Sequence, residues 1–346
     1  MKGRIVILDH LAGRPAAALM VDGKLEDLLI DPPEDVVAPG AIYRAVVDRQ
    51  VKGQGGVFLK LPNGKGFLKQ AKGLAPGQAL LVQASGFSEP GKAVPVTPKF
   101  LFKSRYAIVT PGAPGLNISR SIRDDDERDR LLEIAHEAMG EADDSLGLIL
   151  RSAAESVEEE AILEDIAAMY ELAVGVMSET TGEPELLLDA PDAHTLAWRD
   201  WSDPDPDEVV SHDGAFEELG VLDAIDALDG PTALSGGGSI HVEPTRALVA
   251  VDVNTGADTS PAAGLKANIA AARDLPRQLR LRGLGGQITI DFAPMPKKDR
   301  RQLEQVLKAA FRYDAVDTTH AGWTPLGNFE LQRKRERLPL SESLKT

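Results

Sequence analysis

Two stretches decide the fold of this chain: Leu248-Val249-Ala250-Val251-Asp252-Val253-Asn254 and Gln287-Ile288-Thr289-Ile290-Asp291-Phe292. Both are rich in β-branched residues, which favour β-strands. A helical stretch that ends at Gly285-Gly286 separates them. Because a strand–helix–strand unit crosses over right-handed, it brings the carboxyl ends of two parallel strands side by side. Asp252 and Asp291 are therefore expected at one edge of a sheet.

Two carboxylates at that edge indicate a metal site. Ligands of open α/β sheets bind at the carboxyl ends of the strands, and carboxylate oxygens are preferred ligands of Mg²⁺. Side chains alternate along a strand, so Asn254 shares a face with Asp252. An aspartate at a strand end is also a common cap of the helix or turn that follows. This alternative stays open for each aspartate taken alone.

A series of motifs surrounds the two strands in a fixed order. They are Ser235-Gly236-Gly237-Gly238-Ser239-Ile240, the hairpin Glu243-Pro244-Thr245-Arg246-Ala247-Leu248, the strand end Ala250-Val251-Asp252-Val253-Asn254-Thr255-Gly256, Asn268, the run from Arg277 to Gly286, Ile290-Asp291-Phe292, and Gly322-Trp323-Thr324-Pro325-Leu326-Gly327 followed by Gln332-Arg333-Lys334-Arg335. In order and spacing, these motifs resemble the catalytic core of the ribonuclease E/G family. The resemblance is strongest over residues 235–337.

The resemblance implies an endoribonuclease that depends on Mg²⁺ and cuts single-stranded RNA to 5′-phosphate and 3′-hydroxyl ends. Its role would be RNA processing or decay, including rRNA processing and mRNA decay. Asp252 and Asp291 would hold Mg²⁺, with Mn²⁺ as a substitute, and Asn254 would complete the catalytic set. A cation held in this way polarises the phosphodiester and lowers the pKa of the attacking water.

The resemblance also implies an α/β architecture of several domains. A ribonuclease H-like domain, formed by residues 1–36 and 100–234, would contain an inserted OB-fold RNA-binding domain at 37–99. An α/β metal-dependent nuclease domain of the deoxyribonuclease I type would follow at 235–346.

The residue pattern supports a barrel independently of the resemblance. Strand-like runs separated by Gly and Pro turns are expected at 41–51, 56–61, 65–69, 79–84 and 92–97, after three earlier runs at 4–8, 16–21 and 25–30. Five short strands within about 60 residues are typical of an OB-fold barrel. Beyond the barrel, the pattern predicts helices at 124–139, 156–177 and 215–228, with a strand at 146–152.

Two aromatic residues and one lysine of the barrel are candidates for RNA binding. Phe58 and Phe67 stand on neighbouring expected strands, and the matching family phenylalanines stack on RNA bases. Lys92 matches a family lysine that contacts RNA. The alternative is that the two phenylalanines belong to the barrel core.

A 5′-phosphate sensor is the second feature that the resemblance implies outside the catalytic core. Arg151 and Ser152 stand where the family has an Arg-Thr pair that clamps a terminal phosphate, and Arg120 matches a second arginine. A guanidinium beside a hydroxyl group suits a phosphate. Arg151 lies in an acidic segment, however, so an internal salt bridge is the alternative.

The net charge of −16 is unusual for a protein that binds a polyanion. Residues 124–230 carry 33 acidic and only 4 basic residues. The remaining sequence is therefore basic, and it contains the motifs above. Basic residues cluster around Asp291 and could line an RNA path; they are Arg273, Arg277, Arg280, Arg282, Lys297, Lys298, Arg300, Arg301, Arg333, Lys334, Arg335 and Arg337.

The chain of 346 residues contains no cysteine, which excludes disulfides and thiolate metal ligands. Its first apolar run, up to Leu8, is too short for a signal peptide, and no later run is long enough to span a membrane. We therefore expect a cytoplasmic protein. The family's cysteine-containing zinc link and its C-terminal scaffold for degradosome partners have no counterpart before Thr346. We expect no structural zinc and no zinc-linked tetramer, and a homodimer stays open.

Several positions depart from the family pattern. Ala293-Pro294-Met295 stands where the family usually has an acidic residue, Ala270 replaces a common Glu, and Pro325 replaces a frequent arginine. Pro276 is expected to interrupt the helix before Arg277, and Gly283-Leu284-Gly285-Gly286 is expected to end it. These departures leave two alternatives to a nuclease: a catalytically impaired RNA-binding protein that acts through the OB-fold, and a phosphoryl-transfer enzyme for small substrates.

Overall fold

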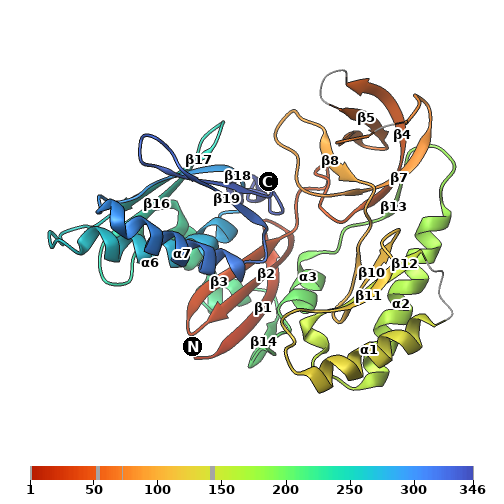
Figure 1. Ribbon diagram of the computed structural model, residues 1–346, viewed down its shortest axis with the longest axis horizontal. Helices are drawn as coiled ribbons and strands as arrows, with labels where there is room; N and C mark the ends of the chain where they lie inside the picture. Colours follow the sequence, from red (N-terminus) through yellow and green to blue (C-terminus); the bar gives the residue numbers. More distant parts are fainter. Residues whose placement is uncertain (1, 52–54, 72, 141–144, 346) are drawn as a thin grey trace. The chain divides into compact units, whose positions relative to one another are not determined.

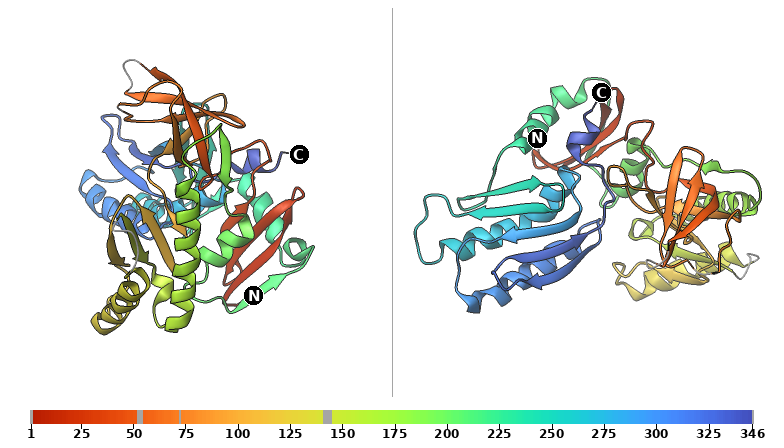
Figure 2. Two further views of the ribbon diagram at one scale, coloured as in Figure 1. Left: turned by 90° about the vertical axis from the view of Figure 1, so that its right-hand side faces the viewer. Right: turned by 90° about the horizontal axis from the view of Figure 1, so that it is seen from above.

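The computed structural model describes residues 2–51, 55–71, 73–140 and 145–345. It divides into two compact units, one formed by residues 1–31 together with 208–346 and the other by residues 32–207. The ribbon in Figure 1 follows the chain by colour, and Figure 2 gives two further views. The fold is a mixed α/β fold, as the sequence predicts.

A six-stranded sheet dominates the first unit, with the strand order β15-β16-β17-β18-β20-β19. The strands are β15 (Thr232–Ala233), β16 (Ser239–Pro244), β17 (Val249–Asn254), β18 (Gly286–Asp291), β19 (Thr318–Trp323) and β20 (Phe329–Arg333). β17 and β18 are parallel, and the other pairs are antiparallel. Helix α6 (Ala263–Leu281) connects the two parallel strands, which confirms the predicted strand–helix–strand unit.

One face of this sheet is apolar and covered by helices. Val251, Ile288 and Ile290 pack into one core with apolar residues of α6 and α7 (Arg300–Arg312). Figure 1 shows both helices along the sheet. Each fully buried aliphatic side chain contributes about 1.5–3 kcal/mol, so the valine and isoleucine pattern fixes which face is covered. The alternate residues consequently lie on the open face.

Helix α6 runs without interruption through Pro276. The expectation that this proline breaks the helix is wrong, because a proline removes only one hydrogen bond and the surrounding core holds the helix in place. The predicted stop at the glycines is confirmed. Gly283 has φ +63°, and its neighbour Leu284 donates a backbone hydrogen bond to the carbonyl of Leu279. A Cβ at Gly283 would overlap the backbone of Leu338, so only glycine fits.

A second, four-stranded sheet in the same unit has the order β14-β1-β2-β3. The strands β1 (Arg4–Leu11), β2 (Arg14–Val21) and β3 (Lys24–Ile30) confirm the three predicted runs, and β14 (Glu208–Ser211) pairs in parallel with β1. Two short helices, α4 (Ala215–Glu218) and α5 (Val221–Asp226), pack on this sheet where one helix was predicted. The break lies at Gly220, whose φ of +71° suits glycine.

Five arginines near the candidate site are bonded inside the first unit, and three of them, Arg277, Arg280 and Arg337, bond to β3 of the second sheet. Arg277, Arg282 and Arg333 are buried. Arg280 pairs with Glu26 of β3 and with the fully buried Asp314. Four others likewise bond to a buried carboxylate or to backbone carbonyls: Arg277, Arg282, Arg333 and Arg337. The expectation that these five arginines line an RNA path is therefore wrong. Their guanidinium groups are largely buried and already bonded to groups inside the protein.

The second unit contains a closed five-stranded barrel that resembles an OB-fold. Its strands pair in the cyclic order β4-β5-β6-β8-β7-β4, and β13 (Glu185–Leu188) adds to β4. The barrel strands are β4 (Ile42–Val51), β5 (Gly56–Leu61), β6 (Gly64–Leu68), β7 (Ala79–Ala84) and β8 (Val94–Thr97). All five lie where the alternating pattern predicts them.

The rest of the second unit is a small sheet with three helices. Strands β9 (Phe102–Lys103), β10 (Ala107–Pro111), β11 (Gly115–Ile118) and β12 (Leu146–Leu150) form the order β11-β12-β10-β9. Helix α1 (Asp125–Met139) and helix α2 (Glu159–Ser178) pack on it, and α3 (Ala193–Asp200) follows. Asp124 caps α1 by accepting a hydrogen bond from the backbone of Glu127 at 2.9 Å, as its acidic start predicts.

Candidate functional site

Asp252 and Asp291 face each other on neighbouring strands. They are partners in the register of the parallel pair β17 and β18, so their backbones lie one strand spacing apart, about 4.8 Å. Both side chains are exposed, while their neighbours Val251 and Ile290 are buried on the opposite face. The two carboxylates therefore lie side by side on the open face of the sheet.

Asn254 lies on the same face and bonds directly to one carboxylate. Its Nδ2 donates a hydrogen bond to Oδ2 of Asp252 at 2.7 Å. This contact restrains the orientation of the Asp252 side chain. Two exposed carboxylates with the remaining positions open to water suit Mg²⁺, which keeps several waters when proteins bind it.

Three close packing contacts hold the ends of the two strands. A Cβ at Gly238 would overlap the carbonyl oxygen of Asn254, and a Cβ at Gly264 would overlap the carbonyl oxygen of Pro294. Glycine at these positions lets the backbone approach both strand ends. The buried side chain of Asn268 also bonds the backbone of Ala293, two residues after Asp291. The position of each carboxylate is thus fixed by neighbouring backbone.

His241 extends the row of the two aspartates to a third strand. It is the register partner of Asp252 in the antiparallel pair β16 and β17, so it shares the open face. Sequence reasoning missed this residue because no motif contains it. The hairpin Glu243–Leu248 sets the register of the two strands that it connects. Aligning these strands from the hairpin would have identified His241 as the partner of Asp252.

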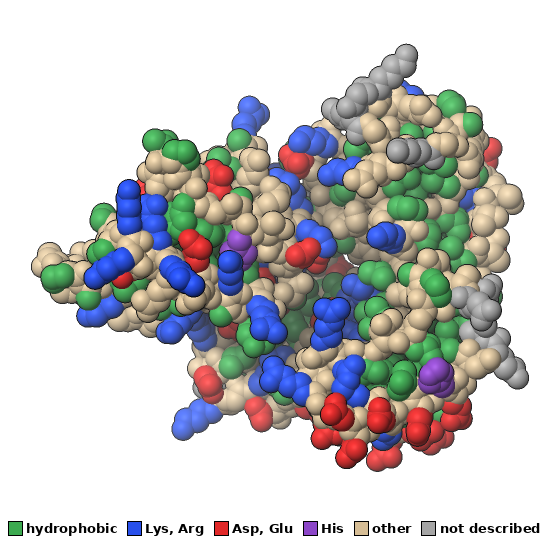
Figure 3. Space-filling model, viewed as in Figure 1, with side chains coloured by type: hydrophobic (Ala, Val, Ile, Leu, Met, Phe, Trp, Pro, Cys, Tyr) green, Lys and Arg blue, Asp and Glu red, His purple; other side chains and the backbone are tan. Residues whose placement is uncertain are grey.

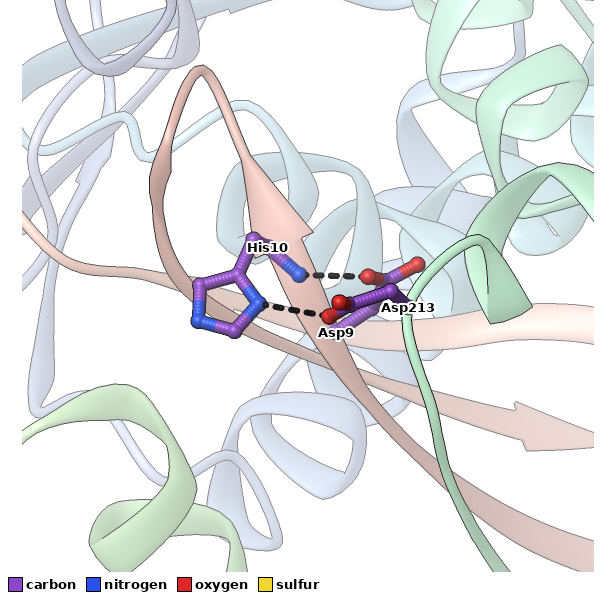
Figure 4. Close-up of side chains that lie close together, drawn as sticks. All are labelled: Asp9, His10 and Asp213. Atoms are coloured by element: carbon purple, nitrogen blue, oxygen red, sulfur yellow. Dashed lines mark hydrogen bonds and ion pairs between the residues drawn. The ribbon is translucent and has the colours of Figure 1, made fainter.

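One other group of side chains has metal-ligand spacing. Among the described residues, a single set of at least three His, Asp or Glu groups keeps all its ligand atoms within 4.8 Å: Asp9, His10 and Asp213. Figure 4 shows the ring of His10 turned towards the carboxylate of Asp213. Asp9 accepts hydrogen bonds from the backbones of His10, Gly214 and Phe216.

These contacts explain the cluster as a structural feature. Burial works to raise the pKa of Asp9, but the backbone hydrogen bonds from Phe216, His10 and Gly214 hold that pKa below its usual range. Asp9 thus joins β1 to the start of α4. Sequence reasoning did not select these residues.

Phe58 and Phe67 lie on the outside of the barrel. They are register partners on β5 and β6, and their ring centroids are 5.3 Å apart. Both are half-buried, whereas Leu59 and Leu68 beside them point into the core. The alternative that the two phenylalanines belong to the barrel core is therefore wrong. The guanidinium of Arg49 lies 5.3 Å from the Phe58 ring.

Basic residues surround this aromatic pair. Lys60 and Lys65 are exposed partners on the same two strands. Lys92, also exposed, pairs with Glu89 at 2.7 Å. An exposed pair of this kind is weak, contributing about 0–1 kcal/mol, so Lys92 can exchange Glu89 for another anion.

The candidate sensor residues follow two neighbouring parallel strands. Ile118 of β11 is the register partner of Leu150 of β12. Arg120 and Ser152 each lie two residues beyond these partners, and Arg120 is exposed. The structure therefore brings Arg120 and Ser152 to the same edge of the sheet.

Arg151 is already engaged by the protein. Its guanidinium donates hydrogen bonds to the carbonyl oxygens of Ser104 (2.6 Å) and Arg199 (3.2 Å). It also forms an ion pair with Asp200 at 2.7 Å. Burial works to raise the pKa of Asp200, but Arg199 and Arg151 hold that pKa below its usual value. The internal salt bridge considered as the alternative for Arg151 is present.

Within the described residues, no helix has the length and apolar character needed to cross a membrane.

The sequence of this chain is similar to those of several ribonucleases. The chain is 29% identical to the ribonuclease E of Nostoc sp., across 92% of this chain and 54% of that protein. It is 31% identical to the ribonuclease G of Salmonella typhimurium, across 75% of this chain and 60% of that protein. For the ribonuclease E of Synechocystis sp., the identity is 32%, with coverage of 78% and 45%. The chain therefore spans about half of the length of these relatives.

A family comparison agrees with these similarities. The model of the Ribonuclease E/G family matches residues 102–220 and 210–336, which is more than half of the chain and includes both aspartates of the open face. The chain belongs to the Ribonuclease E/G family.

Proposed function

We propose that this protein is a metal-dependent endoribonuclease that cleaves single-stranded RNA. The observation that carries the proposal is the pair Asp252 and Asp291, exposed side by side at the carboxyl ends of two parallel strands. Family membership supports it, because the relatives are ribonucleases E and G. The proposed role is RNA processing or decay in the cytoplasm.

In this proposal Asp252 and Asp291 hold Mg²⁺, or Mn²⁺ in its place. The metal would polarise the phosphodiester and lower the pKa of a bound water. Asn254 restrains the Asp252 carboxylate through its 2.7 Å hydrogen bond, so that the carboxylate is oriented before the metal and RNA bind. Attack of water in line with departure of the 3′-oxygen leaves 5′-phosphate and 3′-hydroxyl ends.

The outer face of the barrel is the proposed surface for the RNA strand. Phe58 and Phe67 offer half-buried aromatic rings on which bases can stack, while Arg49, Lys60 and Lys65 supply positive charge for the phosphates. Lys92 would add a further phosphate contact after exchanging Glu89. Binding by stacking and by charge tolerates any RNA sequence, because every base has an aromatic face. Such binding suits single-stranded RNA.

The proposed domain assignment keeps the boundaries 1–36, 37–99, 100–234 and 235–346. We assign the first and third segments to a ribonuclease H-like domain and the last to a deoxyribonuclease I-like domain. Strand β1 pairs with β14 (Glu208–Ser211). This pairing joins the third segment to the first and supports their assignment to one domain.

A contact with the 5′-phosphate of the RNA completes the proposal. Arg120 and Ser152 would bind the phosphate at the edge where β11 and β12 end. Arg151 would join them by exchanging its ion pair with Asp200 for the phosphate. This step costs one internal salt bridge, so the preference for a 5′-monophosphate would be modest.

The experiment is a cleavage assay of purified protein on labelled single-stranded RNA, with Mg²⁺ and with EDTA. We expect cleavage in Mg²⁺ and none in EDTA, and we expect Asp252→Asn and Asp291→Asn each to abolish cleavage. Glu243→Gln is the matched control, because Glu243 is an exposed acid on the neighbouring strand β16 and pairs with Ala250 rather than with an aspartate. Circular dichroism should show that all three variants are folded.

Unchanged cleavage in both aspartate variants would exclude the proposed metal centre. Binding of RNA in EDTA combined with no cleavage in Mg²⁺ would instead favour an RNA-binding protein that has lost catalysis.

A further inference from the structure

A cavity in the first unit lies away from the candidate metal centre. Its volume is about 460 Å³, and the end of α7, the turn after it and β19 line it. His320 of β19 is a lining residue, and its ring contacts the core residues Phe311 and Phe329. The cavity therefore opens beside the helix-covered face of the sheet, whereas Asp252 and Asp291 lie on the open face.

The lining of this cavity contains two cations that are not neutralised. Lys308 and Arg312 stand four residues apart on α7, so they project from one side of the helix. Both residues are exposed. Over the described parts of the chain, neither side chain takes part in an ion pair. Figure 3 shows Lys and Arg side chains gathered over this part of the first unit.

The acidic groups of the cavity are already used by other residues. Asp314 has a fully buried side chain that pairs with both Arg280 and Arg333. Asp317 pairs with Lys334 at 3.2 Å. These partners neutralise the two carboxylates, so the charge facing the cavity is positive.

Two buried nitrogen atoms near the cavity make no hydrogen bond. They are Nδ1 of His320 and Nη2 of Arg333. Arg333 contacts two lining residues, Asp314 and Thr318. Burial, followed by the nearby Lys308, lowers the pKa of His320. Buried polar groups without a partner are rare in proteins. His320 is itself a lining residue, whereas Arg333 does not line the cavity and reaches it only through Asp314 and Thr318.

We propose that this cavity binds a phosphate group, either of a free nucleotide or of an RNA backbone. Lys308 would act as a point charge and Arg312 as a two-pronged donor, which is how these residues bind phosphates in proteins. His320 would contribute a ring N–H. The volume lies within the range of small-molecule sites, about 300–1,000 Å³, and so leaves room for a nucleoside beside the phosphate. The proposal does not depend on the cleavage activity.

Isothermal titration calorimetry with adenosine monophosphate, inorganic phosphate and adenosine tests the proposal. We expect both phosphates to bind the wild-type protein and adenosine not to bind. The double variant Lys308→Ala/Arg312→Ala should bind adenosine monophosphate at least about tenfold more weakly, because it loses two charge-assisted contacts. Arg246→Ala/Lys266→Ala is the control with the same loss of charge, since both residues are exposed and neither lines the cavity. It should bind normally.

Two further measurements sharpen the test. Asp252→Asn should bind adenosine monophosphate like the wild type, which separates this site from the metal centre. The ring signals of His320 in an NMR spectrum, identified by their loss in His320→Gln, should shift when phosphate is added. A single-stranded RNA that displaces adenosine monophosphate in EDTA identifies an RNA backbone as the ligand, and failure to displace it identifies a free nucleotide. Absence of binding to the wild type, or equal binding by the two double variants, would overturn the proposal.

Discussion

The side chain of Asn268 forms two hydrogen bonds with the backbone of Ala293. Its Nδ2 donates to the carbonyl oxygen, and its Oδ1 accepts from the N–H, each at 2.9 Å. Asn268 is fully buried in α6, and Ala293 follows Asp291 by two residues. One helical side chain therefore sets the path of the chain as it leaves the candidate metal centre.

The first prediction concerns these two hydrogen bonds. Asn268→Ala leaves two buried backbone groups without partners, and each such group costs about 1–3 kcal/mol. We expect the free energy of unfolding, measured by urea denaturation, to fall by at least about 2 kcal/mol, and RNA cleavage to fall with it at temperatures where the variant is folded. Asn117→Ala, at an exposed position of β11, is the control. A stable variant with normal cleavage would show that Asn268 does not position the site.

The second prediction concerns the repulsion between Asp252 and Asp291. Like charges directly opposite each other on neighbouring strands destabilise a sheet, and cross-strand pairs of this kind have effects of roughly 0.2–1 kcal/mol. In EDTA, Asp252→Asn should therefore be as stable as the wild type or slightly more stable. Added Mg²⁺ should raise the melting temperature of the wild type, because it binds the folded state only, and should leave the variant unchanged.

The comparison between metal conditions decides this prediction. A variant that is less stable than the wild type in EDTA would indicate that Asp252 acts as a structural cap, which is the simpler role considered for a strand-end aspartate.

The third prediction separates RNA binding from barrel stability. Phe58 and Phe67 lie outside the barrel core. Phe58→Ala and Phe67→Ala should each weaken binding of single-stranded RNA by about 1–3 kcal/mol per stacked base, with little change in melting temperature. Leu59→Ala, in the core of the same strand, should instead destabilise the fold by about 2–5 kcal/mol. Fluorescence anisotropy with labelled RNA and thermal melts measure the two effects.

The fourth prediction concerns pH and Asp274 of α6. Burial works to raise the pKa of Asp274, but Arg277, Lys24 and Gln278 lower it from 3.8 to about 2. A carboxyl whose pKa is lower in the folded state stabilises the fold above its unfolded pKa, and this contribution is lost as the pH falls from about 4 to about 2. The shift corresponds to about 2 kcal/mol.

Urea denaturation at several pH values measures this loss. Asp274→Asn should show a weaker decline in stability between pH 5 and pH 2 than the wild type does. An equal decline in both proteins would show that other carboxylates account for it.

The sequence predicted the elements that repeat a simple pattern and missed those that depend on distant partners. The barrel strands and the parallel pair were predictable because alternation and β-branched runs are local. The pairing of Asp252 with Asp291 followed from the handedness of one crossover connection. The buried arginines could not be predicted, because the carboxylates that bind Arg280 come from β3 and from the turn after α7. Arg151 was ambiguous for the same reason, since Asp200 lies 49 residues away.

The last prediction follows from the ion pair between Arg151 and Asp200. In the proposed sensor, Asp200 competes with the RNA 5′-phosphate for the guanidinium, which the carbonyl oxygen of Ser104 also holds in place. Asp200→Asn removes the competing charge and keeps the shape of the side chain. We expect the ratio of cleavage rates for 5′-monophosphorylated over 5′-hydroxyl RNA to rise in this variant, by roughly fivefold or more for a surface pair of about 1 kcal/mol.

Arg151→Ala should abolish the ratio, and Asp205→Asn is the control, because Asp205 is an exposed acid that pairs with Arg105 instead. Paired substrates that differ only in the 5′ group give the ratio directly. If Asp200→Asn leaves the ratio at one, Arg151 serves only the internal salt bridge. A ratio of one in the wild type as well would exclude the proposed contact of the 5′-phosphate with Arg120, Arg151 and Ser152.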